Sequence, residues 1–242
     1  MSYKAKLNER FRRFIGTLEG FEDIDSLIIG GDTKRADYLI KNRSVIIEQK
    51  VLRSNPLYKV QKYADQLLGT DEIVASGRHS LQTVFNGRLD GRRHSRRLIY
   101  KLSSVLEQDL SHADKQLQNT RNIFSIPGAV GVVVLLNEGA HELVPQLIKF
   151  RVEELLAERT GVGAARFPNI DLVISMTDIH ILKAGGIYRP IGFYASPTSL
   201  NRETAFSFAA YLKERWIGFS GEIHVGCVRP PTRGLAAKLY GR

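Results

Sequence analysis

One apolar run of eight residues constrains the fold of this chain more than any other segment. The run extends from Ala129 to Leu136 and contains no polar or charged side chain. Its length is that of a strand, and its lack of alternation is typical of a strand buried in the centre of a sheet. Because apolar residues recur at helical spacing elsewhere, the sequence favours the α/β class.

The expected elements before this run are a helix, antiparallel strands and then further helices. The first helix covers residues 4–19, a short strand is expected at residues 27–29, and two β-like runs at residues 34–40 and 44–52 flank a tight turn. Helices are expected at residues 57–68, 98–106 and 112–124, a helix at 143–156, strands at 170–176 and 187–194, and a helix at 203–216. We therefore expect one domain with a core over about residues 1–52 and 110–137, an insertion over 53–109 and a C-terminal α/β extension over 138–242.

The two β-like runs place charged side chains together. In a strand the side chains alternate between faces, so Ile46, Glu48 and Lys50 share one face. If Lys41 pairs with Ser44 around a two-residue turn, Asp37 lies opposite Glu48. Two carboxylates so placed repel each other, and a divalent cation between them removes the repulsion. Hard oxygen ligands suit Mg²⁺, with Mn²⁺ as a substitute.

This arrangement fits the hydrolysis of phosphodiester bonds. A metal ion on Asp37 and Glu48, with the backbone carbonyl of Gln49 as a further ligand, would polarise a phosphate oxygen and acidify a bound water. Lys50 would position the attacking water or stabilise the negative charge that develops on phosphorus. Two other interpretations stay open: an edge strand whose Glu48 and Lys50 face solvent, and a competing Asp32-Thr33-Lys34 motif in a turn.

Asp37, in Lys34-Arg35-Ala36-Asp37-Tyr38-Leu39-Ile40, and Glu48-Gln49-Lys50 resemble the motif of the PD-(D/E)xK nuclease superfamily. The resemblance implies a restriction-endonuclease-like core, in the order helix, antiparallel strands, helix, strand, over the first half of the chain. It also implies a DNA endonuclease of restriction, defence, repair or recombination type. Ala36 stands where the family usually has proline.

Other residues of the family pattern have two candidates each in this sequence. Such nucleases often direct a polar side chain to the site from the helix after the strands, which points to Gln116, with Lys115 beside it, or to Gln61. Some members carry a glutamate on the first helix. Here Glu9 and Glu19 compete, and neither is assigned to the site.

The net charge of +10 favours a polyanionic partner, which we expect to be nucleic acid, with DNA preferred. Basic residues gather in one segment, and Arg92, Arg93, Arg96, Arg97 and Lys101, together with Lys115, are the expected phosphate contacts. A non-catalytic nucleic-acid-binding protein on the same fold is the alternative. The single cysteine, Cys227, excludes an intrachain disulfide. The charged N-terminus and the lack of about 20 consecutive apolar residues predict a cytoplasmic protein without membrane contact. The sequence leaves a homodimer open.

Overall fold

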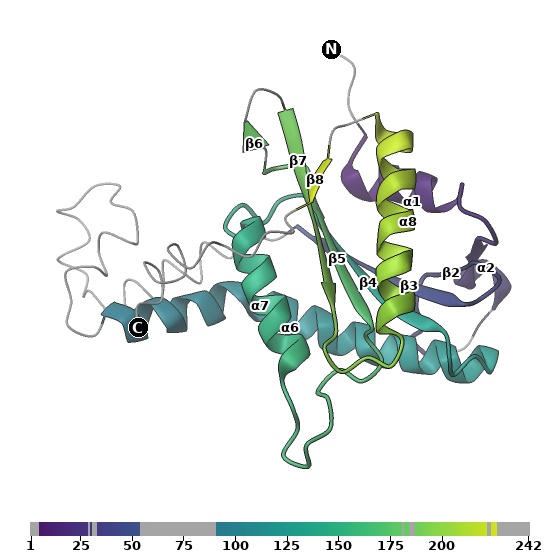
Figure 1. The fold of residues 1–242 in the computed structure, drawn as a ribbon, viewed down its shortest axis with the longest axis horizontal. Coiled ribbons are helices and arrows are strands. Elements are labelled where there is room, and N and C mark those ends of the chain that lie inside the picture. Colours follow the sequence, from purple (N-terminus) through teal and green to yellow (C-terminus); the bar gives the residue numbers. More distant parts are fainter. Residues whose placement is uncertain are drawn as a thin grey trace.

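The computed structural model describes residues 5–28, 30, 33–53, 91–180, 182–183, 187–221 and 224–226. These residues form a mixed α/β structure in which helices cover both faces of one sheet (Figure 1). The elements are α1 (Leu7–Ile15), β1 (Glu22–Asp23), α2 (Ile24–Leu27), β2 (Tyr38–Ile40), β3 (Val45–Leu52), α6 (Gly91–Phe124), β4 (Val130–Asn137), α7 (Pro145–Ala157), β5 (Leu172–Thr177), β6 (Leu182–Lys183), β7 (Ile187–Ala195), α8 (Arg202–Ser220) and β8 (His224–Gly226).

The sheet has the strand order β1-β2-β3-β4-β5-β7-β6, and β8 pairs with β7. Strands β3, β4 and β5 are parallel, whereas β2 pairs antiparallel with β3 and β1 pairs antiparallel with β2. The order α1, β1, β2, β3, α6, β4 therefore contains the helix, antiparallel strands, helix and strand that the sequence predicts. Strands β5 and β7 come from the region expected as a C-terminal extension, and they belong to the same sheet.

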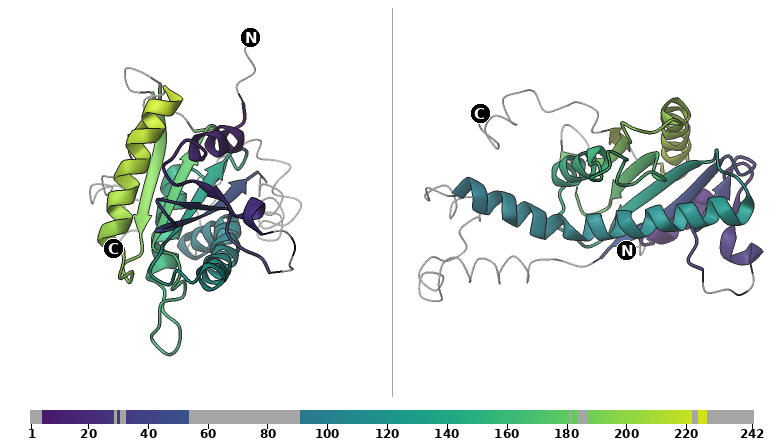
Figure 2. Two further views of the ribbon diagram at one scale, coloured as in Figure 1. Left: turned by 90° about the vertical axis from the view of Figure 1, so that its right-hand side faces the viewer. Right: turned by 90° about the horizontal axis from the view of Figure 1, so that it is seen from below.

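Alternating side chains divide the core into two layers. Val45 and Ile47 of β3 pack with α1 and α8, where Phe14 and Trp216 meet edge to face at 5.0 Å. Ile46 and Leu52 of β3 pack on the other side with α6 and α7. The right view of Figure 2 shows α8 and α6 on opposite sides of the sheet. All eight residues of β4 are buried, which confirms the predicted central strand.

Helix α6 differs from the prediction of two helices, which was wrong. It runs without interruption for 34 residues and begins at Gly91, inside the region expected as an insertion. Residues 107–111, between the two expected helices, contain neither glycine nor proline. The buried stripe of Leu106, Leu110, Ala113 and Leu117 continues across them at helical spacing, so nothing in the sequence ends the first helix.

The chain before β2 also differs from the prediction. Leu27 is the last residue of the short helix α2 and is not part of a strand. Asp23 caps the start of this helix by accepting the N–H of Asp25, which favours helix over strand here. The strand expected at residues 34–40 is reduced to Tyr38–Ile40. The expected helix at residues 57–68 and the alternative residue Gln61 lie outside the described residues. Within the described part, no helix is long and apolar enough to cross a membrane.

Candidate active site

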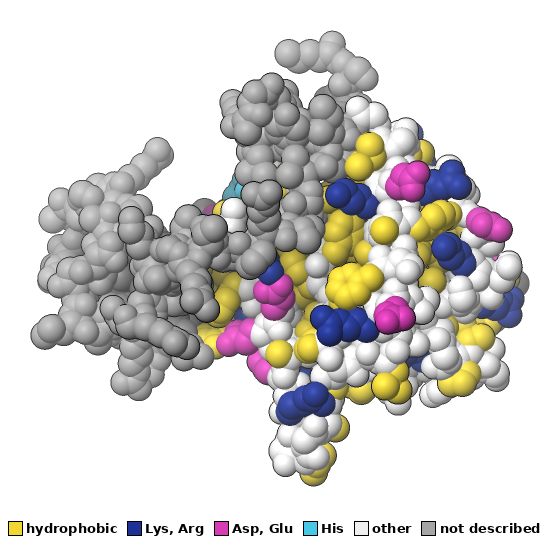
Figure 3. Space-filling view, viewed as in Figure 1, with side chains coloured by type: hydrophobic (Ala, Val, Ile, Leu, Met, Phe, Trp, Pro, Cys, Tyr) yellow, Lys and Arg dark blue, Asp and Glu magenta, His cyan; other side chains and the backbone are white. Residues whose placement is uncertain are grey.

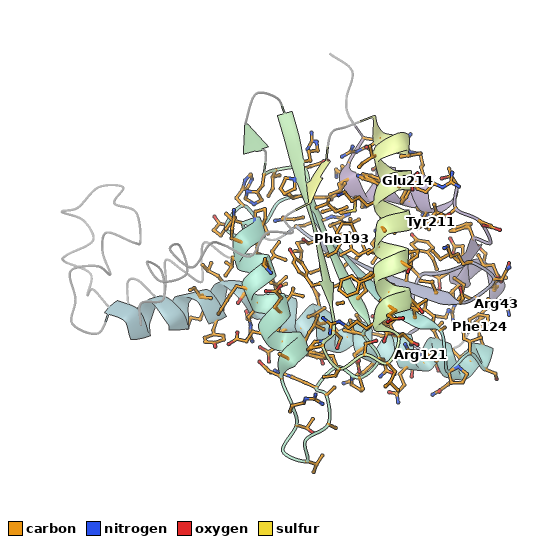
Figure 4. All side chains as sticks on the ribbon, viewed as in Figure 1. Arg43, Arg121, Phe124, Phe193, Tyr211 and Glu214 are labelled. Carbon is orange, nitrogen blue, oxygen red and sulfur yellow. The ribbon has the colours of Figure 1, made fainter. Side chains whose placement is uncertain are left out.

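The β2–β3 turn sets the register of the site. Lys41, Asn42 and Arg43 all have positive φ angles, of 50°, 54° and 65°, and the N–H of Ser44 donates to the carbonyl of Lys41 at 3.2 Å. Such backbone is strained for residues other than glycine. Side-chain contacts hold it: Arg43 pairs with Glu22 at 2.7 Å and lies over the ring of Phe124, at 5.1 Å (Figure 4).

The predicted register is confirmed as far as the ladder extends. Ile40 pairs with Val45, and the last pair joins Tyr38 to Ile47. Asp37 is the next residue and lies at a bend, where its N–H donates to the carbonyl of Ile47 at 3.1 Å. Its side chain then acts as the acceptor for the next backbone N–H on this edge of β3: Asp37 Oδ2 accepts the N–H of Gln49 at 2.6 Å. This bond orients the Asp37 carboxylate toward the face of β3 that carries Glu48.

Glu48 is a buried acid with one unused oxygen. Only 2% of its surface is exposed, and its Oε1 lies 2.6 Å from the ammonium of Lys50. Its Oε2 is buried and accepts no hydrogen bond within the described part of the chain; when Glu48 is protonated, its hydroxyl can donate to Asp37, but the ionised carboxylate leaves this oxygen without a partner. A buried polar atom without a partner is costly, so this oxygen marks a position where a ligand would be stabilised.

The two carboxylates disturb each other's ionisation. Burial and the nearby charge of Asp37 raise the pKa of Glu48 to about 8, although Lys50 acts in the opposite direction. Burial also raises the pKa of Asp37, while the N–H of Gln49 and the charge of Lys50 lower it. Near neutral pH, without a further cation, Glu48 therefore keeps its proton. Such a pair is typical of a site that binds a positive ion.

Gln116 of α6 completes the polar face under β3. Its Oε1 accepts a hydrogen bond from Lys50 Nζ at 2.8 Å, and its Nε2 donates to the carbonyl of Arg35, also at 2.8 Å. The structure thus brings Gln116 to Lys50, as the sequence-based expectation required. The neighbouring Lys115 is exposed and has no place in these contacts. Gln116 limits the positions that the Lys50 ammonium can adopt.

Two further α6 side chains hold the segment that leads into Asp37, and sequence reasoning missed both. Asn119 Nδ2 donates to the carbonyl of Lys34 at 2.8 Å. Thr120 Oγ1 accepts the N–H of Ala36 at 2.9 Å and donates to the carbonyl of Gln116. Residues 34–36 bond to α6 in this way, which explains why β2 begins only at Tyr38. The polar residues at 116, 119 and 120 share one side of a helix, and this spacing was the available signal.

Proline could not replace Ala36 without loss of one of these bonds. The Ala36 N–H is a hydrogen-bond donor to a fully buried threonine, and proline has no N–H. Ala36 itself is buried, with 1% of its surface exposed. Alanine at this position is therefore part of the contact with α6.

Asp109 is an acidic residue that the sequence analysis did not select. It precedes Gln116 by two helical turns and is partly buried. Burial raises its pKa, whereas the charges of Lys50 and His112 lower it. Asp109 therefore adds negative charge on the α6 side of Lys50. Among the described residues, no group of three or more His, Cys, Asp or Glu side chains is arranged to hold a metal ion.

The expected phosphate-contact residues lie elsewhere on α6. Arg92, Arg93, Arg96 and Arg97 occupy the first turns of the helix, and their side chains are outside the described part; Lys101 is exposed. Tyr100 is engaged within the protein: its hydroxyl donates to Glu154 at 2.6 Å, and Arg151 lies over its ring. Of the residues left open, Glu9 and Glu19 are exposed, and Asp32 is not among the described residues.

A pocket of about 320 Å³ opens at the carboxyl ends of β3, β4 and β5, and it contains neither carboxylate of the pair. Its two acids are already paired. Glu138 accepts the N–H of Asn8 and lies 3.3 Å from Arg53, while Asp178 pairs with Arg10 and Arg189. The polar face formed by Asp37, Glu48, Lys50 and Gln116 is therefore the stronger candidate.

Comparisons of this chain with known protein families, with curated proteins and with solved structures find no match. The chemistry of the site must therefore be inferred from its own residues.

Proposed function

We propose that this protein is a metal-dependent nuclease that hydrolyses phosphodiester bonds, as a DNA endonuclease using Mg²⁺, with Mn²⁺ as a substitute. The observation that carries the proposal is the buried Glu48. It faces Asp37, has one unpartnered oxygen and touches Lys50 on the same face of β3. A sheet selected for stability alone would place apolar side chains at these positions.

The donor set fits a divalent cation of the magnesium type. Such ions prefer oxygen ligands and often use one or two carboxylates together with water, so a carboxylate pair is sufficient. The unpartnered Oε2 of Glu48 offers a position for the ion. Burial raises the pKa of both acids, so a further positive charge beside them would stabilise their ionised forms. When bound, such an ion polarises a phosphate oxygen and lowers the pKa of a bound water.

The protein groups around the pair have separate tasks in this proposal. Lys50 supplies a positive charge for the phosphate as negative charge develops on it, and Gln116 restrains the ammonium at 2.8 Å. The N–H of Gln49 orients the Asp37 carboxylate. The backbone carbonyl of Gln49 stays a predicted ligand.

The resemblance to PD-(D/E)xK nucleases supports the same proposal. The order of the described elements from α1 to β4 agrees with that expected of a restriction-endonuclease-like core. Asp37 directly precedes β2, and Glu48-Gln49-Lys50 lies in the adjacent strand β3. The departure at Ala36 has a local reason, because its N–H binds Thr120. The net charge of +10 agrees with a nucleic-acid substrate.

The test is cleavage of supercoiled plasmid by the purified protein in Mg²⁺, in Mn²⁺ and in EDTA. We expect cleavage with either metal and none in EDTA. Asp37→Asn, Glu48→Gln and Lys50→Ala should each abolish it, whereas the exposed Glu19→Gln should not. DNA binding without metal-dependent cleavage would instead support the non-catalytic alternative. Retained activity in Lys50→Ala would show that the site lies elsewhere.

A further inference from the structure

We propose that the first turns of α6 form a basic arm, residues 91–101, that binds a duplex phosphate backbone up to about one helical turn from the carboxylate pair. The substrate would then be a duplex that continues for about ten base pairs beyond the cut. This inference rests on the proposed nuclease function and specifies the substrate of that same site.

One continuous helix connects the arm to the site. Its later turns pack under the sheet through Leu106, Leu110 and Leu117, which are fully buried, and Gln116 holds Lys50 at 2.8 Å. Its first turns extend past the strands, as the left side of Figure 1 and the right view of Figure 2 show. Since the helix has no break from Gly91 to Phe124, the arm has a set position relative to the carboxylates.

The arm differs in charge from the rest of α6. From Gly91 to Leu106 the sequence contains five Lys or Arg residues and no acidic residue, whereas Glu107, Asp109 and Asp114 follow. Arg93, Arg97 and Lys101 recur every four residues, a spacing that places them on one side of a helix. Like charges at this spacing destabilise a helix, so a polyanionic partner would relieve the repulsion.

Basic and acidic side chains are interspersed on the face of the molecule over α8, shown in Figure 3, whereas the sequence of the arm contains no acidic residue. Arg202, Glu203, Glu214 and Arg215 of α8 are all exposed. A mixed surface of this kind offers no continuous attraction to phosphate. The arm is therefore the better surface for a nucleic-acid backbone.

The rise of the helix gives the distance from the site to the arm, which can be expressed in base pairs of a bound duplex. Lys101 and Arg93 precede Gln116 by 15 and 23 residues. At about 1.5 Å per residue these separations are about 22 and 35 Å along the axis. Phosphates of one DNA strand advance about 3.4 Å per base pair, so the arm reaches phosphates about six to ten base pairs away when α6 follows the duplex. Duplex DNA is stiff over this length and can occupy both positions at once.

The experiment compares duplexes that extend 4, 8, 12 and 20 base pairs on each side of a central site, with single strands of the same lengths. Binding is measured by fluorescence anisotropy in Ca²⁺ over a salt titration, and cleavage is measured in Mg²⁺. The arm variant is Arg93→Glu/Arg97→Glu. Its matched control is Arg13→Glu/Arg215→Glu, which changes the charge equally at exposed positions of α1 and α8, on the other face of the sheet.

Wild type and control should bind long duplexes at least tenfold more tightly than the shortest duplex, with most of the gain reached by 12 base pairs. The arm variant should lose this gain while it treats the shortest duplex as wild type does. Its slope of log affinity against log salt should fall by about 1.8, since each lost phosphate contact removes about 0.9. Wild-type affinity independent of length, or equal effects of both double variants, would overturn the inference. Length-dependent binding through the arm without cleavage would support it and count against the nuclease proposal alone.

Discussion

Strands β3 and β4 lie side by side and have the same length and direction, yet β3 carries charged side chains at its centre where β4 carries apolar ones. Glu48 pairs in register with Val133, and Lys50 with Leu135. Val133 and Leu135 are fully buried in an apolar layer. Glu48 is almost as deeply buried, although it is an acid. The single polar residue of β4, Asn137, bonds to Ala140 and Leu143.

The difference shows that burial alone does not decide what a central strand can hold. β3 can hold two ionisable side chains because hydrogen bonds order the groups around them. Lys50 donates to Gln116, which in turn donates to the carbonyl of Arg35, and the N–H of Gln49 orients Asp37. Even so, one oxygen of Glu48 has no partner among the described residues. The one polar side chain of β4 is hydrogen-bonded by the loop that follows the strand. β3 instead has a buried carboxylate oxygen that can accept a ligand, as expected of a strand that carries a functional site.

The largest effect should come from a variant that makes β3 resemble β4. We expect Glu48→Val/Lys50→Leu to lower cleavage by about a thousandfold or more, because both the ligand and the positive charge are lost. Its free energy of unfolding should stay equal to that of wild type or rise by about 1–4 kcal/mol, as for other buried ion pairs replaced by apolar residues. Plasmid cleavage and urea denaturation measure the two quantities.

The single variant Lys50→Leu is the control for that comparison. It leaves Glu48 without its ammonium partner, so above pH 8 it should be less stable than both wild type and the double variant. A double variant less stable than Lys50→Leu would mean that the polar pair stabilises the fold.

The second effect is a dependence of stability on pH in metal-free protein. The pKa of Glu48 is raised to about 8 from an ordinary value of 4.5, so between these values the folded state holds a proton that the unfolded state has lost. Stability should therefore be greatest below pH 4.5 as far as this group is concerned. It should fall as pH rises toward 8, by at most about 1.4 kcal/mol per pH unit.

Chemical denaturation at a series of pH values in EDTA measures this slope. Glu48→Gln cannot ionise and should remove most of it, whereas Glu19→Gln should leave it unchanged. An equal slope in wild type and Glu48→Gln would assign the dependence to other groups.

The third effect concerns metal binding. Mg²⁺, Mn²⁺ or Ca²⁺ should stabilise the folded protein, by about 2.7 kcal/mol at a concentration one hundred times Kd. Binding should release a proton near pH 7, because Glu48 must ionise to act as a ligand. Calorimetric titration in buffers of different ionisation enthalpy measures both the affinity and the proton release.

Asp37→Asn should lose most of the metal-induced stabilisation. Its amide oxygen can still accept the N–H of Gln49. Above pH 8, where Glu48 is ionised in the metal-free wild type, the variant should be at least as stable as wild type, since one of two repelling acids is then neutral. Equal metal affinity in wild type and Asp37→Asn would show that the two carboxylates do not form one site.

The smallest effect should come from the contact between α6 and the segment before Asp37. Thr120→Val removes the acceptor for the Ala36 N–H and should cost about 1–3 kcal/mol, with a partial loss of cleavage. Thr120→Ser should restore both. Ala36→Pro removes the same bond from the other side, so its cost and that of Thr120→Val should not add in a double-mutant cycle. Full additivity would mean that this bond contributes nothing to the position of Asp37.

Local spacing in the sequence was sufficient for the parts of the site that lie within one hairpin. The alternation of β3 places Glu48 and Lys50 on one face, and the length of the turn determines the pairing of Ile40 with Val45. The continuous apolar run likewise identified β4 as a central strand. These features depend on neighbours a few residues apart, which is why they could be read without a structure.

The tertiary structure alone decided how α6 completes the site. Gln116 meets Lys50 and Arg35 across 66 and 81 positions of sequence, and Thr120 meets Ala36 across 84. Those contacts replace strand pairing at residues 34–36, which the β-like composition of that segment did not reveal. They also require one continuous α6, because its buried stripe is stabilised by the sheet rather than by local propensity. Side chains brought together by packing leave no periodic signal, so only the folded chain shows how the carboxylate pair is held.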